Sequence, residues 1–324
     1  MKTSSKSCFK NSLKRFSQSI LNRNVTLALA LSTAVCARAA DIGKTFATPE
    51  AAVAALLAAA SAKDTNAFRV IFGPVGVAIE NPDRVQAANE LSEFNAAVNQ
   101  HQRLVQESDT RCVLEIGDND WPFPVPIVKR NGQWFFDTEA GKDEILNRHI
   151  GKNELSTLQA VRAYVEAQRE YAAKDRDGDE VLEYAQKFNS TPGTKDGLYW
   201  PSDLDGENSP LGPLVAQAQL LGYGKKPKED GAAPEPFHGY FFRVLTHQAK
   251  SAPGGRYDYI INSNMIGGFA LVAWPAEHGE SGIMTFIVNQ QGRVYQKDLG
   301  PKTASVAGAM RAYAPDKTWS LSPD

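Results

Sequence analysis

The sequence predicts a mixed α+β protein with two domains after a targeting segment, and three observations carry this prediction. An alanine-rich stretch over residues 48–62 opens a run of predicted helices. The Asn131-Gly132 pair separates two strand-like runs, PIVKR and QWFFD, as expected of a two-residue β-hairpin. Residues 237–299 hold short β-branched and aromatic runs divided by Gly, Pro and Asn, which predict one continuous antiparallel meander.

Residues 1–39 predict a cleavable signal peptide. A basic region without acidic residues precedes an apolar run over residues 25–35, and Ala37 and Ala39 supply the small residues of a signal-peptidase site. The run of about eleven residues is too short for a bilayer, which needs roughly 20. We therefore expect cleavage near Ala39 and export to the periplasm or beyond. A lipid anchor on Cys36 is an alternative, although Val35 is a poor residue before a lipidated cysteine.

Composition indicates an ordinary soluble globular protein. The 324 residues suffice for two domains, and 42% are hydrophobic and 22% charged. The formal net charge of −2 gives no reason to expect nucleic acid or an anionic membrane as a partner. Cleavage would remove Cys8 and Cys36, which leaves Cys112 without an internal disulfide partner. We expect Cys112 to be a buried, inert thiol in a strand.

Residues 45–150 are predicted to form an N-terminal α+β domain. Thr48 and Pro49 begin the first helix, because Thr48 can accept free helical N–H groups and Pro49 suits the first turn. A second, short helix is predicted over residues 66–72, where Gly-Pro follows, and a third over residues 83–99.

Strands follow these helices, first at residues 112–116 and then in the Asn131-Gly132 hairpin. Three helices followed by a sheet resemble, in element order, the nuclear-transport-factor-2-like or cystatin-like fold, a curved sheet wrapped on a helix. Such folds often carry a pocket, so we consider four residues as its rim. Polar turn residues beside core aromatics are the alternative interpretation of these four: Asp118, Asp120, Trp121 and Trp134.

Residues 151–324 are predicted to form the second domain. Gly151 is expected to end a linking helix over residues 140–149, and Asn153 to cap a long helix that reaches residue 174. Apolar residues at steps of three and four predict a buried stripe on this helix, with Tyr164 and Tyr171 alongside. The stripe consists of Leu155, Leu158, Val161, Val165 and Ala172.

Weaker elements are predicted beyond the long helix. Short helices are expected over residues 180–188 and 214–221, and a last one over residues 304–313. Residues 193–213 are rich in Gly, Pro and Asp and predict an irregular segment, and residues 225–236 predict a polar loop.

Several motifs resemble one bacterial family along most of the chain. They are WPFP at residue 121, AQREYAAKDRDGD, DGLYWP, SPLGPL, HGYFFRVL, GGFALVAWPAEHG and MTFIVNQQGRVYQKDLG. Together with the signal peptide they look like the family of domain of unknown function 2950. This resemblance implies an exported bacterial protein without an assigned activity, and it supplies no catalytic or binding residue.

The second domain is also similar to the globular heads of type IV pilins and pseudopilins. The likeness lies in a helix that ends in AQxxYA, followed by GYxFxL, FALVAxP and TFIV strands and a final G-x-V-Y strand. Pilins begin with a processed apolar helix, whereas here the corresponding helix starts at Asn153-Glu154 after a whole domain. The resemblance therefore implies a pilin-like head used as a soluble module, without assembly into a pilus.

One acidic run is a candidate cation site. Asp175, Asp177 and Asp179 occupy positions 1, 3 and 5 of a loop, where carboxylates can converge on Ca²⁺ as in half an EF-hand. Position 6 holds Glu180 in place of glycine, and position 12 holds Gln186 in place of glutamate. A solvated acidic turn that binds nothing is the alternative.

Other motifs give no chemistry. His238, His247 and His278 lie at separations that match no known zinc pattern. The sequence holds no G-x-S-x-G, no phosphate-binding GxxxxGK[ST], and no GxGxxG after a strand.

Three function classes remain open from the sequence. The first is an exported, non-catalytic module that binds an envelope protein or a polysaccharide, which exposed aromatics on residues 193–213 would support. The second is a hydrolase or small-ligand enzyme with a site in the N-terminal domain or between the domains, which requires at least two of four carboxylates to converge. The third is a calcium-stabilised structural protein. The four carboxylates are Asp118, Asp120, Asp137 and Glu139.

Overall fold

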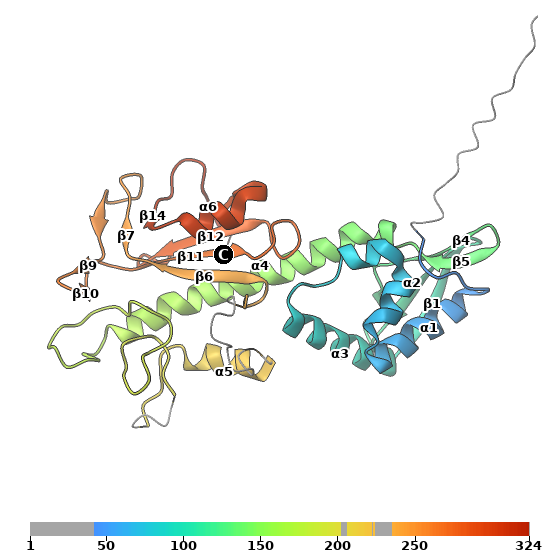
Figure 1. Cartoon of the computed structure of the whole chain (residues 1–324), viewed down its shortest axis with the longest axis horizontal. Coiled ribbons are helices and arrows are strands. Elements are labelled where there is room, and N and C mark those ends of the chain that lie inside the picture. Colours follow the sequence, from blue (N-terminus) through green and yellow to red (C-terminus); the bar gives the residue numbers. More distant parts are fainter. Residues whose placement is uncertain (1–41, 202–205, 222, 224–234, 324) are drawn as a thin grey trace, which may run out of the picture. The chain divides into compact units, whose positions relative to one another are not determined.

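The computed structural model describes residues 42–201, 206–221, 223 and 235–323 (Figure 1). These residues belong to one compact unit. Helices and mostly antiparallel strands combine in a mixed α+β architecture, which confirms the predicted fold class. The predicted signal peptide and most of the predicted loop over residues 225–236 lie outside the described residues. The division into domains at residue 150 stays a prediction.

Three helices open the described chain: α1 (Pro49–Ala62), α2 (Thr65–Ala78) and α3 (Arg84–Gln100). The predicted start of α1 is confirmed, because the Thr48 hydroxyl accepts a hydrogen bond from the Ala51 N–H at 3.2 Å. Asp83 caps α3 in the same way and accepts from the N–H groups of Val85 and Gln86, both at 3.0 Å.

The predicted second helix is followed, after a kink, by a further helical segment. Gly73 has φ +70°, and a second helical segment follows this kink and reaches Ala78. A Cβ on Gly73 would meet the backbone N of Gly43 at 2.8 Å, so the glycine allows both the kink and a close approach. The first helical segment therefore ends at the Gly-Pro pair as predicted, and the second segment up to Ala78 is the part that the sequence did not predict.

A five-stranded antiparallel sheet follows, in the order β1-β2-β4-β5 with β3 paired to β2. Cys112, Leu114 and Ile116 are buried at alternate positions, which leaves one face of β2 on the core. The predicted hairpin is confirmed, because Asn131 and Gly132 both have positive φ and Arg130 pairs with Gln133. The strands are β1 (Gln102–Ser108), β2 (Arg111–Ile116), β3 (Trp121–Pro122), β4 (Ile127–Arg130) and β5 (Gln133–Phe136).

A single helix, α4 (Thr138–Tyr171), replaces the predicted linking helix, break and capped helix. The predicted break at Gly151 was wrong. An interior glycine lowers helix stability by only about 1 kcal/mol, and the packing of α4 on both sides of this position outweighs that cost. The cap at Asn153 was also wrong, because this side chain is fully buried within the helix. Asp137 begins α4 instead and accepts from the Ala140 N–H at 3.3 Å.

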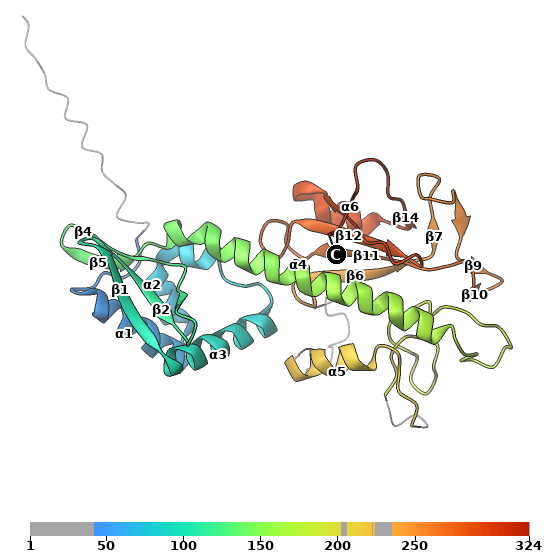
Figure 2. The same ribbon diagram turned by 180° about the vertical axis from the view of Figure 1, so that it is seen from behind.

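The buried stripe of α4 is confirmed at Leu158, Val161 and Val165, together with Tyr164 and Tyr171. Two residues differ from the prediction: Leu155 is 65% exposed, and Ala172 is half-buried just beyond the end of α4. The stripe packs on β11 (Ala270–Pro275) and β12 (Met284–Asn289), along which α4 runs in Figure 2.

The C-terminal sheet has the order β15-β13-β12-β11-β6, with antiparallel pairing throughout. All six residues of β11 are buried, and β11 contacts both α4 and α6. This inner strand is therefore covered on both faces. The remaining elements are β6 (Tyr240–Leu245), β13 (Tyr295–Asp298), β15 (Ser320–Leu321), α5 (Gly212–Leu221), η2 (Gly300–Lys302) and α6 (Thr303–Ala309).

The prediction of one continuous meander was wrong at one place. Strand β6 pairs directly with β11, and residues 246–269 between them leave the sheet. This excursion folds around Tyr259, which is fully buried and whose amide N–H donates to the Thr246 carbonyl at 2.8 Å. Its strands form a separate hairpin and, together with one strand from near the C-terminus, a small sheet. They are β7 (His247–Gln248), β8 (Tyr257–Asp258) and β14 (Ala312–Tyr313) in the sheet, and β9 (Ile260–Ile261) and β10 (Asn264–Met265) in the hairpin.

The predicted helix over residues 180–188 was wrong as well, because this segment is irregular. Its backbone donors have partners elsewhere in the chain: Tyr184 N–H donates to the Met265 carbonyl, and Ala185 N–H to the Gln168 side chain. Helical hydrogen bonds would require the same donors. The helix predicted near residue 214 is confirmed as α5, and the last one is shorter than expected because β14 follows it.

Buried hydrophobic residues form two clusters, one from residues 46–136 and the other from residues 158–313. Helix α4 contributes to both, because Ile145 packs against the first and its later turns belong to the second. Within the described ranges, no helix combines the length and hydrophobicity needed to cross a bilayer.

Candidate functional site

The candidate site is a pocket of about 390 Å³ between α3, α4 and the strands β2 and β3. Its volume falls in the range of small-ligand sites, roughly 300–1,000 Å³. Apolar groups form most of the lining: Ile79, Phe94, Ala97, Ile116, Trp121, Pro124 and Ile145. Polar groups come mainly from the two helices: Asn81, Glu90, Glu93, Arg148, His149 and Lys152.

Trp121 is the exposed aromatic residue of this pocket, with 41% of its surface accessible. The Arg148 guanidinium lies over its ring at 4.8 Å from the centroid, an attractive cation–π geometry. Arg148 also pairs with Glu144 one helical turn earlier and donates to the Pro122 carbonyl at 3.4 Å. These contacts hold the indole ring at the rim.

The other rim charges are paired with one another. Lys152 Nζ lies 3.5 Å from a Glu90 carboxylate oxygen and 3.7 Å from one of Glu93. Asn81 Nδ2 donates to the second Glu90 oxygen at 3.2 Å. All three charged side chains are partly exposed, so each pair contributes at most about 1 kcal/mol to stability.

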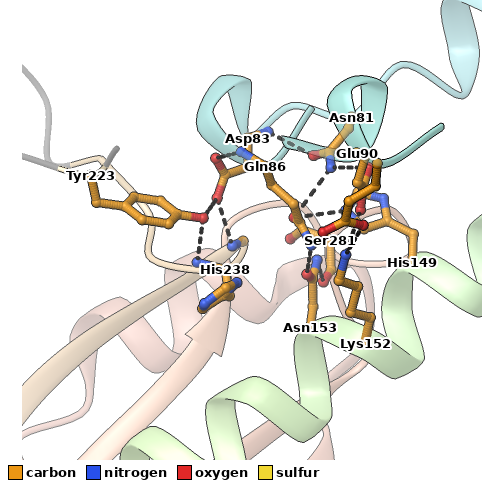
Figure 3. Close-up of polar contacts among 12 residues, drawn as sticks. Asn81, Asp83, Gln86, Glu90, His149, Lys152, Asn153, Tyr223, His238 and Ser281 are labelled. Carbon is orange, nitrogen blue, oxygen red and sulfur yellow. Dashed lines mark hydrogen bonds and ion pairs between the residues drawn. The ribbon is translucent and has the colours of Figure 1, made fainter. Parts of the chain in front are cut away.

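A buried polar network forms the wall behind the pocket (Figure 3). The Gln86 side chain lies at its centre and donates from Nε2 to Asn153 Oδ1 at 2.8 Å. Asn153 Nδ2 donates in turn to the Ser281 carbonyl at 2.8 Å. Gln86 Oε1 lies 3.2 Å from both Asn81 Nδ2 and His149 Nε2. The network therefore joins α3 and α4 to the turn before β12.

A second branch starts at Asp83, which is also buried (Figure 3). Its Oδ2 accepts from the Tyr223 hydroxyl at 2.6 Å and from the Gly239 N–H at 3.3 Å. Gly239 has φ +71°, and a Cβ there would lie 2.7 Å from Asn153 Nδ2 and 2.9 Å from Ser281 Cβ. The two branches of the network thus meet at Gly239, where a larger side chain would collide with Asn153 and Ser281.

Burial governs the ionisation of this region. Desolvation lowers the pKa of His149, against the attraction of the nearby Glu90 and Asp83 carboxylates. Burial likewise lowers the pKa of His238, and it raises the pKa of the Tyr223 phenol, which also donates to Asp83. Both imidazoles are therefore neutral at pH 7.

The family model described as "Protein of unknown function (DUF2950)" matches residues 43–321. The chain belongs to this DUF2950 family. This confirms the resemblance drawn from the motifs. Searches of the curated proteins and of the solved structures both return no match.

The four predicted rim residues of this DUF2950 member lie in different places. Trp121 lines the pocket. Asp118 and Asp120 are exposed in the turn between β2 and β3, where Asp120 lies 3.5 Å from His101 Nε2. Trp134 is buried in the N-terminal core, and its backbone pairs with Phe46.

The acidic loop does bring its carboxylates together. Oxygens of Asp175, Asp177 and Asp179 lie within 4.8 Å of one another, and all three residues are exposed. Asp175 accepts from the N–H groups of Gly178 and Glu180, which lowers its carboxyl pKa. Glu180 has φ +66°, so it adopts the backbone that glycine normally supplies at this loop position. These hydrogen bonds account for the loop without an ion, and calcium binding stays a prediction.

The remaining candidates are dispersed. Within the described ranges, the acidic loop is the one group of three or more side chains with metal-ligand spacing, so the three histidines do not converge. His278 Nε2 contacts Asp298 at 2.8 Å on the surface. Cys112 is buried as expected, which raises its thiol pKa. In the described part of residues 193–213, Trp200 is buried and Tyr199 half-buried, so this segment lacks the exposed aromatics that would have supported a binding module there.

Sequence reasoning missed the network and most of the rim. Asn153 was interpreted as a cap, and Gln86 and His149 as ordinary helix positions. A usable signal was present, because Arg148 and Lys152 are four residues apart, as are His149 and Asn153. The four side chains therefore lie near one another on α4. Their partners on α3 are more than fifty residues away, and spacing within one helix does not reveal them.

Proposed function

We propose that this protein is an exported, non-catalytic binding module, and that the pocket beside Trp121 is its binding site. The observation that carries the proposal is an apolar cavity of ligand size with an exposed, arginine-held tryptophan at its rim. Binding sites combine apolar lining with a few placed polar groups in this way. The signal-peptide pattern of residues 1–39 supports export, and components of the cell envelope are the natural ligands.

Binding fits this site better than hydrolysis does. The rim carboxylates of Glu90 and Glu93 pair with Lys152, and such pairing opposes their use as a free acid and base. The hydrolase hypothesis relied on the convergence of four carboxylates, and their positions weaken it. Asp118 and Asp120 are exposed in a turn. Asp137 caps α4, and Glu139 is exposed in the first turn of that helix.

Filling the pocket tests the proposal. Ala97→Phe places a ring in the cavity, and Ala96→Phe adds the same ring at an exposed position of α3 as a matched control. The mature protein is melted with muropeptides, soluble envelope oligosaccharides and short acyl amides. We expect at least one ligand to raise the melting midpoint of the wild type and of Ala96→Phe, but not of Ala97→Phe. Equal stabilisation of both variants, or no stabilisation by any ligand, contradicts the proposal.

We further propose that the C-terminal part is a soluble counterpart of a pilin head. The packing of the long helix α4 on β11 and β12 supports this, since pilin heads place a long helix on an antiparallel sheet. Helix α4 begins after a complete α+β segment, and its first turns pack against α2. Electron microscopy of the concentrated mature protein is expected to show no filaments, and ordered filaments would contradict this assignment.

A further inference from the structure

The Ser281 carbonyl determines which group donates and which accepts in each hydrogen bond of the network behind the pocket. The Ser281 main-chain carbonyl can only accept, so the Asn153 atom at 2.8 Å must be its Nδ2 donor. Asn153 therefore presents Oδ1 to Gln86. Because that oxygen also only accepts, Gln86 must present Nε2 to it and Oε1 to the opposite side.

The orientation of the Gln86 amide determines which ring nitrogen of His149 carries the proton. Gln86 Oε1 accepts a hydrogen bond from Asn81 Nδ2. The orientation of Asn81 has independent support, because Asn81 Oδ1 accepts from the Asp83 backbone N–H at 2.9 Å. His149 Nε2 lies at the same Gln86 oxygen, so Nε2 must carry the proton. A neutral imidazole has one N–H, and Nδ1 is then a lone-pair acceptor.

Among the hydrogen bonds of the described residues, none involves His149 Nδ1. His149 lines the pocket, where most neighbouring groups are apolar. The charged groups that face this imidazole are Glu90 and Asp83 from α3 and Lys152 from α4, and burial keeps the ring neutral against the two carboxylates. The pocket therefore offers an oriented, uncharged acceptor beside the paired carboxylates of Glu90 and Glu93.

The charges of the lining cancel. Glu90 and Glu93 carry two negative charges, and Arg148 and Lys152 carry two positive ones. A charged ligand would lose hydration without finding a net counter-charge, whereas a neutral ligand avoids this cost.

We infer that the pocket takes a neutral ligand with an apolar group and one N–H or O–H donor, and that His149 Nδ1 accepts this donor. The inference rests on the proposed function and narrows it to a ligand class. A ligand without the donor would leave Nδ1 buried and unpaired, and a charged analogue would be rejected by desolvation.

A matched pair of probes tests the donor. Indole carries an N–H on an apolar bicycle, and 1-methylindole has nearly the same shape without the donor. Both are titrated into the ¹⁵N-labelled mature protein at pH 7.5, and the backbone signals of Phe94 and Ala97 report occupancy. We expect indole to bind about ten-fold more tightly than 1-methylindole. Equal affinities overturn the inference but leave the pocket as a binding site, whereas no shift at Phe94 and Ala97 with either probe overturns both.

Two controls isolate His149. His149→Phe keeps an aromatic ring but removes the acceptor, and it should abolish the preference for indole; a preserved preference contradicts the inference. The wild type itself supplies the second control, because lowering the pH below about 6.5 moves towards protonated His149, which places a proton on Nδ1. Indole binding should weaken more than 1-methylindole binding once the pH has fallen through the lowered pKa of His149, and an unchanged ratio there counts against the inference.

Discussion

Two polar regions of the molecule, the acidic loop and the buried network, are organised in opposite ways. The Asp175–Asp179 loop takes its hydrogen bonds largely from its own neighbours, such as the Gly178 and Glu180 N–H groups, and its carboxylates are exposed. The Gln86–Asn153 network is buried, and it joins residues 67 and 128 positions apart in the chain. Water can replace a lost contact in the loop but cannot do so in the network. Substitutions should therefore be costly in the network and mild in the loop.

The largest expected effect is that of Asn153→Ala. The change leaves the Gln86 N–H and the Ser281 carbonyl without their buried partner, and we expect the free energy of unfolding to fall by about 3 kcal/mol. Urea denaturation measures the loss. Gln159→Ala on the exposed face of α4 is the control and should change stability by less than about 0.5 kcal/mol. Similar small losses in both variants would show that the network is not a stabilising element.

A glycine pair separates steric fit from backbone strain. Gly239 and Gly255 have similar positive φ values, +71° and +79°, but a Cβ at Gly239 would lie 2.7 Å from Asn153 Nδ2 whereas Gly255 has open space. We expect Gly255→Ala to cost about 1 kcal/mol from the left-handed backbone alone. Gly239→Ala should cost about 2 kcal/mol more, because it also displaces Asn153. Equal losses in urea denaturation would mean that the network tolerates an added methyl group.

The buried network region should also make stability depend on pH, through its two half-buried histidines. Burial lowers the folded-state pKa of His149 and His238, whereas the unfolded value is about 6.5. The folded state therefore binds fewer protons, so this contribution to stability is complete above about pH 6.5 and is lost as the pH falls through the lower folded pKa values. Urea denaturation between pH 7.5 and 5 should show a steeper loss for the wild type than for His149→Gln. Parallel slopes would show that His149 titrates alike in both states.

The smallest effect concerns the acidic loop. The calcium hypothesis predicts that millimolar Ca²⁺ stabilises the folded state by about 1 kcal/mol, since a ligand of the folded state alone must stabilise it. Thermal melts with calcium and with chelator measure this shift. It should vanish in an Asp175→Asn, Asp177→Asn double variant, and identical melting midpoints of the wild type in both conditions would exclude the site.

Local rules predicted the elements whose causes are local. The Thr48 cap and the Asn131-Gly132 hairpin follow from hydrogen bonds and backbone angles of a few adjacent residues, and both are confirmed. The buried face of α4 follows from its periodic apolar residues in the same way.

The failures share one physical cause, which is a distant partner. Gly151 and Asn153 resemble a helix break and a cap, but Asn153 is satisfied by Gln86 and Ser281 far away in the chain. Residues 180–188 have helical composition, yet Met265 and Gln168 take their N–H groups. Trp121 was the one rim residue found from the sequence, because an exposed aromatic beside a turn has a local signature, whereas a cross-helix network does not.

The central claim is that this network holds His149 as a hydrogen-bond acceptor towards the pocket. Ring ¹⁵N chemical shifts of histidine-labelled protein at pH 7.5 test it most directly, because protonated and unprotonated ring nitrogens resonate far apart. We predict a pyrrole-type Nε2–H and a pyridine-type Nδ1 for His149 in the wild type. We predict a mixture of tautomers in an Asn81→Ala, Asn153→Ala double variant, because neither side chain that orients the Gln86 amide remains. A proton on Nδ1 of His149 in the wild type would contradict the account.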